Sequence, residues 1–339
     1  MKKILLSVLL MIFSQQMFTQ TLYHKALPRD INSSFRALSV IDDRQAWVSG
    51  SNGYVGITSD GGESWAFTRV KGYEKCDFRS LYAFDSKRAV IATAGSPACI
   101  LRTTNGGRSW KKVFYVADTL AFFDGMDFWN EKEGIIYGDP LNGRLYLAST
   151  TDGGKTWKQA DWNNRPATLE GEASFASSGT GIRCFKEHKV MILTGGMASR
   201  LLISLNAGES WRKVSLPLRH GTQSEGAYSV AFADDTTGII VGGDYTKERV
   251  ISDFCLYSYD GGFGWVHSYS LTGGYRECVE FIDPQTAIAV GPSGMDITVN
   301  RGVEWGPFSE DKGFHVIRKA RNGNLIVVAG NSRVALIRP

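Results

Sequence analysis

Short hydrophobic runs separated by Gly-, Asp- and Asn-rich breaks repeat along almost the whole chain. In the first unit, runs at 35–40 and 46–48 are separated by two aspartates, a third run at 54–57 leads into a polar turn, and 65–67 leaves it. Runs of this length that are rich in β-branched and aromatic residues and bounded by turn residues predict strands. The same order recurs at 78–103 and 126–148, and later units begin near 174, 228 and 278. Each unit therefore predicts one sheet, and the chain predicts an all-β fold.

One octet recurs before the last run of each unit. Its first copy extends from Thr58 to Trp65 with the sequence TSDGGESW, and the six copies occupy 58–65, 103–110, 150–157, 204–211, 258–265 and 298–305. Their tryptophans are 45, 47, 54, 54 and 40 residues apart, close to the length of a four-stranded propeller blade. The Asp or Asn can accept backbone N–H bonds, the glycine supplies positive φ, and the tryptophan offers apolar surface between two sheets and an N–H for a carbonyl. The octet predicts a hairpin clamp and is a signal for fold, not for activity.

These octets resemble the Asp-box, or bacterial neuraminidase repeat, S-x-D-x-G-x-T-W. In propellers with this repeat, the box joins the third strand of a blade to the fourth, on the face away from the usual ligand site, and the resemblance implies the same placement here. Three copies carry Asn in place of Asp, which keeps the acceptor oxygen. Gly264 and Glu304 replace the hydroxyl residue of the fifth and sixth copies, so we expect those two turns to be looser.

The two ends of the chain predict how the ring closes. Six octets account for six blades, and further runs at 314–317, 325–329 and 334–338 follow the last octet. Another run, 21–27, precedes the first blade and belongs to none. If it pairs with the last run, the fold is a seven-bladed β-propeller of four-stranded blades. Residues 21–339 then form a single domain whose last blade is closed by the N-terminal strand, which also removes exposed sheet edges.

The first twenty residues have the layout of a secretory signal peptide. Lys2 and Lys3 precede a largely apolar stretch at 4–13, and polar residues follow, as in signals that are removed on export. The stretch is too short to span a bilayer, which needs about 20 apolar residues. We therefore assign 1–20 as a signal peptide and expect a chain without a membrane span, exported to the periplasm, the cell surface or the extracellular space.

Composition and charge narrow the class of partner. Lys+Arg number 38 and Asp+Glu 34, a net charge of +4 without a run of five like charges, which argues against a nucleic-acid groove. We find no phosphate-binding loop or dinucleotide fingerprint, and therefore expect no cofactor. No cysteine or carboxylate spacing matches a zinc or calcium site, so we expect no metal. We also expect a monomer.

Five cysteines remain to be explained, Cys76, Cys99, Cys184, Cys255 and Cys278. Their spacing favours buried apolar packing for most of them. Cys76 and Cys99 should fall on the same face of the second blade and are candidates for one disulfide, which an exported protein can keep.

Candidate chemistry lies where the innermost strand of each blade begins. Propeller blades are usually traversed from the innermost strand outward, so these residues line the mouth of the central channel. We align the blades by their apolar pattern and add Asp244 from a long excursion within the fifth blade. The candidate ligand-binding set is then Arg36, Arg79, Asp124, Glu172, Tyr228, Asp244, Arg276 and His315. In the sixth blade the pattern fits Glu277 as well as Arg276. Mixed cations and carboxylates around a concave pocket predict recognition of a polar ligand, whereas simple solvation of a wet channel mouth would produce the same pattern.

The whole chain is similar to bacterial members of the photosystem II stability/assembly factor-like family, which are seven-bladed propellers with an Asp-box in most blades. The resemblance covers about residues 21–339 and rests on the octets and on blade-start phrases such as FIDPQTAIAVG at 281–291. It implies a propeller that binds a protein partner during assembly and performs no reaction. The family's cationic partner-binding patch maps loosely to Arg36 and Arg79, whereas Asp124 and Glu172 in the same ring point to a different partner.

Two functions follow from these observations. The first is an exported, non-catalytic propeller that binds a protein partner or a polar small molecule or glycan at the channel mouth, as an assembly or stability factor. The second is a glycoside hydrolase of the sialidase type, with Glu172 paired with Asp124 or Glu170 for acid–base work. Against the second, the sequence has no F-R-I-P start and no convincing set of three arginines, a nucleophilic tyrosine and a partner glutamate, so we name no catalytic residue.

Overall fold

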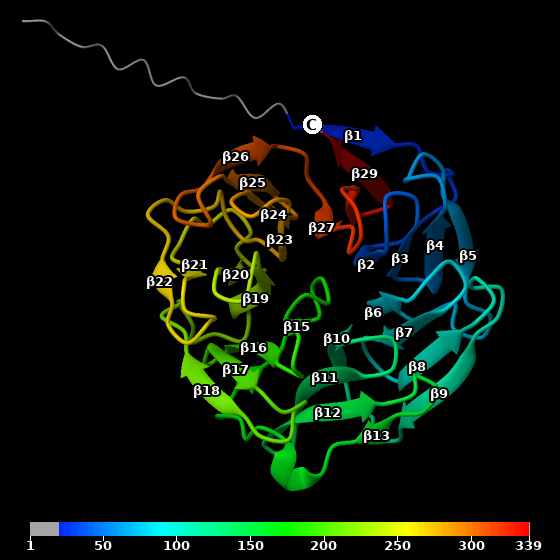
Figure 1. Cartoon of the computed structure of the whole chain (residues 1–339), viewed down its shortest axis with the longest axis horizontal. Coiled ribbons are helices and arrows are strands. Elements are labelled where there is room, and N and C mark those ends of the chain that lie inside the picture. The colour runs from blue at the N-terminus through cyan, green and yellow to red at the C-terminus, as the bar shows by residue number, and fades with distance from the viewer. Residues whose placement is uncertain (1–19, 339) are drawn as a thin grey trace, which may run out of the picture.

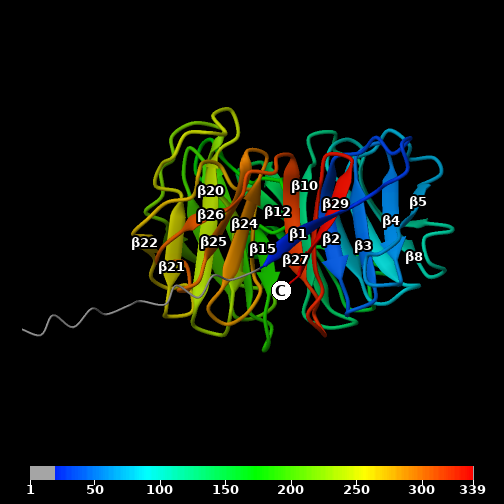
Figure 2. The same cartoon turned by 90° about the horizontal axis from the view of Figure 1, so that it is seen from above.

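The protein is described by a computed structural model that places residues 20–338. The expected signal peptide, 1–20, lies outside the described residues apart from Gln20. Strands β1 to β29 make up the fold, with one short 3₁₀ helix, η1 (Trp162–Asn164). Figure 1 shows the sheets arranged radially around a central axis, and Figure 2 shows their strands running along that axis. The fold is thus an all-β propeller, as the hydrophobic pattern predicts.

The strands pair in antiparallel fashion, and in four of the sheets they follow one another in chain order. The first sheet contains β2 (Phe35–Val40), β3 (Ala46–Gly50), β4 (Tyr54–Thr58) and β5 (Ala66–Arg69). The second contains β6 (Phe78–Ala83), β7 (Ala89–Thr93), β8 (Ala98–Thr103) and β9 (Lys111–Val116). The third contains β10 (Phe123–Phe128), β11 (Gly134–Leu141), β12 (Arg144–Thr150) and β13 (Lys158–Gln159).

The next strands are joined into one nine-stranded sheet. One part contains β14 (Glu172–Ala173), β15 (Ile182–Cys184), β16 (Val190–Gly196), β17 (Arg200–Ser204) and β18 (Arg212–Ser215). The other part contains β19 (Glu225–Phe232), β20 (Gly238–Asp244), β21 (Cys255–Ser258) and β22 (Val266–His267). The parts meet through one residue pair of β16 and β19, Gly195 opposite Gly226.

The last two sheets contain the remaining strands. One is formed by β23 (Cys278–Phe281), β24 (Ala287–Gly291), β25 (Gly294–Thr298) and β26 (Gly306–Ser309). The other is formed by β27 (Phe314–Lys319), β28 (Ile326–Gly330), β29 (Arg333–Arg338) and the N-terminal strand β1 (Thr21–Lys25). In this sheet β1 pairs with β29 from Thr21 opposite Arg338 to Lys25 opposite Val334, so one sheet takes strands from both ends of the chain.

The core lies between neighbouring sheets. One buried cluster, for example, joins Val90 and Ile100 of the second sheet to Phe128 and Ile136 of the third. The strands that carry these residues either alternate apolar and polar residues or are apolar throughout. Both faces of a radial sheet pack against a neighbour, which is the burial pattern of sheets stacked face to face.

The six octets form turns with the same hydrogen bonds. In the first, the Thr58 hydroxyl accepts the N–H of Gly62 at 2.9 Å, and Asp60 Oδ1 accepts the N–H of Ser64 at 3.0 Å. The bond from the fifth residue of the octet back to the leading hydroxyl recurs in the other five copies at 2.8–3.1 Å. The octets therefore act as the local clamps that their residue types predict.

Two expectations about these turns need correction. The fifth and sixth turns are not looser in their hydrogen bonds, because Gly264 still donates its N–H to Asp260 at 2.8 Å, and Glu304 accepts a bond from the Asn300 amide at 3.0 Å in place of the missing hydroxyl. The tryptophan N–H reaches a carbonyl in only two copies, from Trp211 to Gly208 and from Trp265 to Gly262. The indole nitrogens of the other four have no hydrogen-bond partner within residues 20–338.

The cysteines behave mainly as packing residues. Cys99, Cys255 and Cys278 are fully buried, and Cys76 and Cys184 are partly buried. All five are free thiols, so the candidate disulfide between Cys76 and Cys99 is wrong. Among the described residues, no helix is long and apolar enough to cross a membrane.

Candidate functional site: the upper cavity

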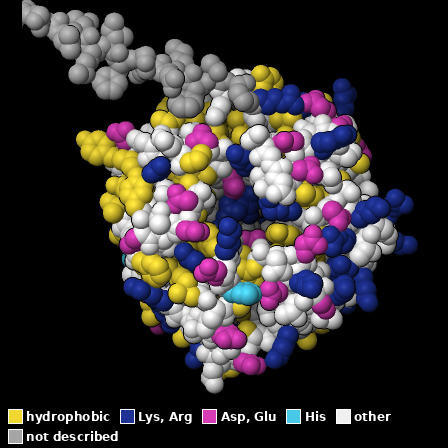
Figure 3. Space-filling model, viewed as in Figure 1, with side chains coloured by type: hydrophobic (Ala, Val, Ile, Leu, Met, Phe, Trp, Pro, Cys, Tyr) yellow, Lys and Arg dark blue, Asp and Glu magenta, His cyan; other side chains and the backbone are white. Residues whose placement is uncertain are grey.

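A cavity of about 500 Å³ opens at the end of the ring where the innermost strands begin. We call this end the upper end and the hollow the upper cavity; the octet turns lie at the opposite, lower end. Figure 3 shows the opposite, lower end, with basic side chains gathered around the central opening. Five of the eight predicted residues line the cavity, namely Arg36 on β2, Arg79 on β6, Asp124 on β10, Tyr228 on β19 and His315 on β27.

The same backbone irregularity carries all five side chains. The pairing of β2 with β3 passes from Phe35 to Ala37 and leaves Arg36 as an extra residue. Register shifts at Arg79, Asp124, Tyr228 and His315 have the same form. A bulge of this kind bends a strand and re-aims a side chain. The bulges therefore direct these residues to the channel, while the aromatic residue before four of them, Phe35, Phe78, Phe123 and Phe314, stays buried in the core.

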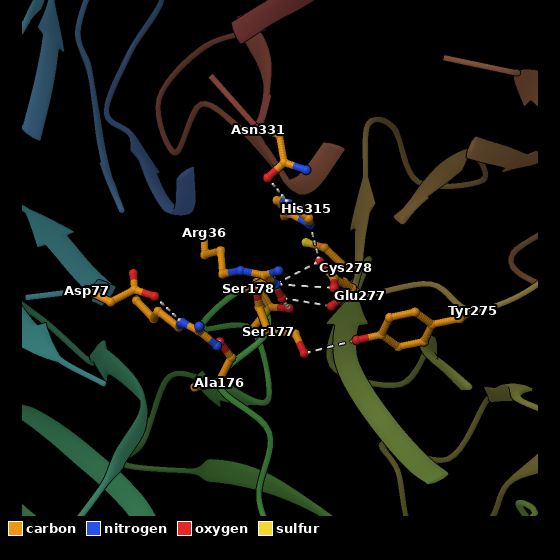
Figure 4. A network of polar contacts seen from close by, with 12 residues as sticks. Arg36, Asp77, Ala176, Ser177, Ser178, Tyr275, Glu277, Cys278, His315 and Asn331 are labelled. Carbon is orange, nitrogen blue, oxygen red and sulfur yellow. Dashed lines mark hydrogen bonds and ion pairs between the residues drawn. The ribbon is translucent and has the colours of Figure 1, made fainter. Parts of the chain in front are cut away.

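Glu277 is the centre of a charged network on one side of the cavity. Arg36 Nη1 lies 3.2 and 3.1 Å from its two carboxylate oxygens, and His315 Nδ1 lies 2.6 Å from Oε2. His315 Nε2 lies 2.9 Å from the Asn331 side-chain oxygen. Figure 4 shows Arg36 and His315 converging on Glu277 from different sheets. Burial acts to raise the pKa of Glu277, but His315 and Arg36 outweigh it, so the pKa lies below its usual value.

Asp124 differs from Glu277 because burial, rather than ion pairing, dominates its surroundings. Its side chain is fully buried, and neither carboxyl oxygen has a hydrogen-bond partner among residues 20–338. Burial raises the pKa of Asp124 well above its usual value, and the nearby charge of Asp139 adds to the effect, against a weaker lowering by Arg79. Burial also raises the pKa of Asp139, which accepts the backbone N–H of Ser174 at 3.0 Å. A protonated carboxyl can donate one hydrogen bond and accept others, so Asp124 offers both to a molecule in the cavity.

Arg79 and an aromatic wall complete the lining. Arg79 Nε donates to Asp77 at 2.7 Å and Nη1 donates to the Ala176 carbonyl at 3.3 Å. Tyr228 stacks on Phe175 with ring centroids 4.0 Å apart, and its other neighbour is Tyr275 at 4.8 Å. The cavity thus has an aromatic wall within a lining that is otherwise largely polar or charged.

Three predicted residues do not line this cavity. Glu172 lies on the short strand β14, where Arg200 Nε donates to it at 2.8 Å. Arg276 pairs with Asp296 at 2.5 Å, and both are buried. Asp244 accepts the backbone N–H of Thr246 at 2.9 Å and pairs with Lys247 at 3.1 Å. Each of them makes contacts within its own part of the ring, because these three residues do not occupy the bulged position of an innermost strand.

The sequence reasoning also missed several lining residues. In the sixth blade the apolar pattern left Arg276 and Glu277 open, and it is Glu277 that lines the cavity. Asp139, Phe175, Tyr245 and Glu248 come from second strands and connecting segments. The usable signal was the repeated aromatic residue followed by a polar one at the start of each innermost strand.

Known proteins resemble this chain in sequence and in fold. A family model described as "Photosynthesis system II assembly factor YCF48" matches residues 18–120. "Photosystem II assembly lipoprotein Ycf48" of Synechococcus sp. (strain CC9902) is 23% identical over 270 residues, which cover 71% of this chain and 77% of that protein.

Two solved structures extend the likeness to the whole fold. "YCF48 from Cyanidioschyzon merolae" superposes with a TM-score of 0.67 at 17% identity and covers 94% of this chain and 99% of that one. "YCF48 bound to D1 peptide" superposes with a TM-score of 0.66 at 15% identity and covers 94% and 96%. At these identities the structures show a shared propeller fold. In sequence and fold, the chain resembles the photosynthesis system II assembly factor family.

Proposed function

We propose that this protein is an exported, non-catalytic β-propeller that binds a segment of a protein partner in its upper cavity and acts as an assembly or stability factor. We count the nine-stranded sheet as two blades and propose a seven-bladed ring, monomeric, whose last blade is closed by β1. The signal-like segment at 1–20 and the word lipoprotein in the name of the Synechococcus relative support export.

The observation that carries the proposal is the set of bulged side chains around the upper cavity. Arg36 and Arg79 supply guanidinium donors, which suit the carboxylate or carbonyl oxygens of a peptide. The unpartnered carboxyl of Asp124 suits the amide groups of the same chain, because it can donate and accept. Tyr228, stacked on Phe175, offers apolar surface for a side chain. The likeness to a protein solved with a bound D1 peptide supports a peptide as the occupant.

The charges of the cavity favour binding over hydrolysis. A glycosidase needs two carboxyl groups free to act on either side of the scissile bond. Glu277 is held in ion pairs with Arg36 and His315, which leaves it poorly placed for proton transfer. Glu172, the residue proposed for acid–base work, is bound to Arg200 outside the cavity.

A displayed library of random peptides, selected on the immobilised chain from residue 21 onward, tests the proposal. We expect enriched peptides whose affinity falls about tenfold or more in the Arg36→Gln, Arg79→Gln double variant, since each loss removes a charge-assisted hydrogen bond. The matched control is an Arg108→Gln, Arg212→Gln double variant at exposed positions, which should retain binding.

Two results would overturn the proposal. One is equal binding by the cavity variant and the control variant, with unfolding curves confirming that both are folded. The other is turnover of chromogenic glycosides, including sialosides, that Asp124→Ala abolishes, because it would make the upper cavity a catalytic site.

A further inference from the structure

The lower end of the channel contains two adjoining hollows, of about 90 and 320 Å³. We call them the lower hollows. They share the lining residues Tyr82, Asp127, Arg183, Glu280 and Arg321. The smaller hollow is completed in part by Arg318 and Lys319, and the larger by the aromatic side chains of Phe128, Phe185 and Phe232. Nothing in the proposed peptide binding uses them.

The lower hollows carry an excess of positive charge. Four cations, Arg183, Arg318, Lys319 and Arg321, face two carboxylates, Asp127 and Glu280. Glu280 is shared by Arg183 at 2.6 Å and Arg318 at 3.2 Å. Asp127 is occupied by the backbone N–H groups of Cys184 and Phe128, each at 2.8 Å. Both carboxylates are therefore already engaged, and two cations remain.

Those two cations are held by neutral groups. Arg321 donates to the Ser39 hydroxyl at 3.0 Å and to the Ala83 carbonyl, and its guanidinium lies 4.6 Å from the centre of the Tyr82 ring. Lys319 donates to the Ile282 carbonyl at 2.7 Å. Within residues 20–338 neither has a carboxylate at salt-bridge distance, although Lys319 acts from further away on Asp43 and Asp283, and Arg321 on Asp127. Positioned cations without an ion-pair partner in a concave site attract anions.

The larger hollow adds an apolar surface beside this charge. Phe185 and Phe232 meet edge to face with ring centroids 5.1 Å apart. Phe185 directly follows β15, and Phe232 is the last residue of β19. Both residues line the larger hollow together with Arg183. The two hollows together thus offer a cationic corner and an aromatic wall.

We propose that the lower hollows bind a small organic anion. Its phosphate or carboxylate group contacts Arg321 and Lys319, and a compact apolar part lies against Phe185 and Phe232. The smaller hollow has a volume of only about 90 Å³. This volume favours a free small molecule over a peptide chain. This site is independent of peptide binding at the upper end.

Calorimetric titration of the folded chain from residue 21 onward with phenyl phosphate, benzoate and inorganic phosphate tests the site at low ionic strength. We expect saturable binding of one phenyl phosphate or benzoate per chain, at least threefold tighter than inorganic phosphate. Equal affinity for inorganic phosphate would overturn the apolar part of the assignment. No saturable binding of any of the three probes would overturn the site.

Variants locate the binding. Lys319→Gln and Arg321→Gln should each weaken it about tenfold, the loss expected for one charge-assisted hydrogen bond. Because Arg321 also packs on Tyr82, the Lys319 variant keeps the test valid if the Arg321 variant does not fold. Arg36→Gln at the upper end and exposed Arg108→Gln should bind as the wild type does. A loss in Arg36→Gln that matches the loss in Lys319→Gln would place the anion in the upper cavity and overturn the assignment.

An opposite change sharpens the test. Asp127→Asn removes a negative charge from the lower hollows and keeps an oxygen for only one of the two backbone N–H groups, of Phe128 and Cys184. Once thermal unfolding confirms that the variant is folded, it should bind phenyl phosphate about threefold or more tightly. Weaker binding by this variant would contradict an electrostatic origin.

Discussion

Two glutamates three residues apart show how differently the two ends of the channel are built. Glu277 faces the upper cavity between Arg36 and His315, and Glu280 faces the lower hollows between Arg183 and Arg318. The pKa of Glu277 is lowered because its cationic partners outweigh burial. The pKa of Glu280 is raised by burial, which Arg183 opposes and the like charge of Asp127 reinforces. Two basic neighbours therefore do not by themselves decide the direction in which the pKa of a carboxyl group shifts.

The comparison predicts a large difference in stability. Glu277→Gln should lower the free energy of unfolding by about 3–5 kcal/mol, since it leaves the Arg36 guanidinium without its carboxylate partner and alters the hydrogen bond to His315 in a buried network. At Glu280 the ion pairs do not fully offset the cost of burying the charge, since burial raises its pKa. Glu280→Gln should therefore lose less stability, about 1 kcal/mol. Urea unfolding of both variants at neutral pH measures the difference, and equal losses would contradict it.

The octet turns provide a second contrast, because they fasten only the lower end. Thr58→Val should cost about 1–3 kcal/mol, the usual penalty for leaving a buried donor unsatisfied, here the N–H of Gly62. Thr298→Val in the sixth turn should cost a similar amount, because its bond to Gly302 has the same length of 2.9 Å. Thermal unfolding compares the two. A markedly smaller cost at Thr298 would restore the expectation of a looser sixth turn.

Asp124 predicts a gain where most substitutions cause a loss. Asp124→Asn should stabilise the fold by about 1 kcal/mol at pH 8, because it removes the need to keep a buried, unpartnered carboxyl neutral. Asp77→Asn is the matched control, since Asp77 pairs with Arg79 at 2.7 Å and its loss should not stabilise. Denaturant midpoints at constant m-value decide the sign, and a destabilised Asp124 variant would show that its carboxyl has a structural partner.

Glu277 and Glu280 should affect the pH dependence of the free energy of unfolding in opposite directions. A folded-state pKa below the unfolded value gives stability that is present above the unfolded pKa of about 4.3 and is lost as the pH falls through the folded pKa. Glu277 therefore contributes to acid unfolding. Glu280, with a raised pKa, contributes stability below the unfolded pKa that is lost as the pH rises through the folded pKa.

Unfolding free energies measured from pH 3 to pH 7 test these signs. The Glu277→Gln curve should fall less steeply toward acid than the wild-type curve, and the Glu280→Gln curve should rise relative to wild type between about pH 5 and 7. The Arg108→Gln variant serves as a control without a change in shape. Slopes that change in the same direction in both glutamate variants would remove the distinction between the two ends.

The sequence predicts the propeller and part of the site for identifiable reasons. The six octets determine local turns, so their spacing reports the repeat directly. Arg36, Arg79, Asp124, Tyr228 and His315 were found because they share one position in one repeated strand. Glu172, Asp244 and Arg276 were misplaced because segments outside that repeat have no internal register to align. The bulge that aims the five side chains is a property of strand pairing, and a hydrophobic pattern does not report pairing when one residue is inserted.

The lower hollows were not predicted because their cations come from the far ends of innermost strands and from the turn after β27. Arg321 packs on Tyr82, which is distant in the sequence and close in the fold. Only three-dimensional proximity brings such residues together.

The pairing of β1 with β29 has a consequence for biosynthesis. Thr21 is among the first described residues to leave the ribosome and Arg338 among the last, yet they are opposite one another in one sheet. The intermediate sheets can form before the ring closes, but β1 cannot pair with β29 until that last strand is in place. Contacts between segments so far apart form slowly, so closure of the ring is expected to be a late step of folding, and β1 is open to proteases and to wrong partners until then.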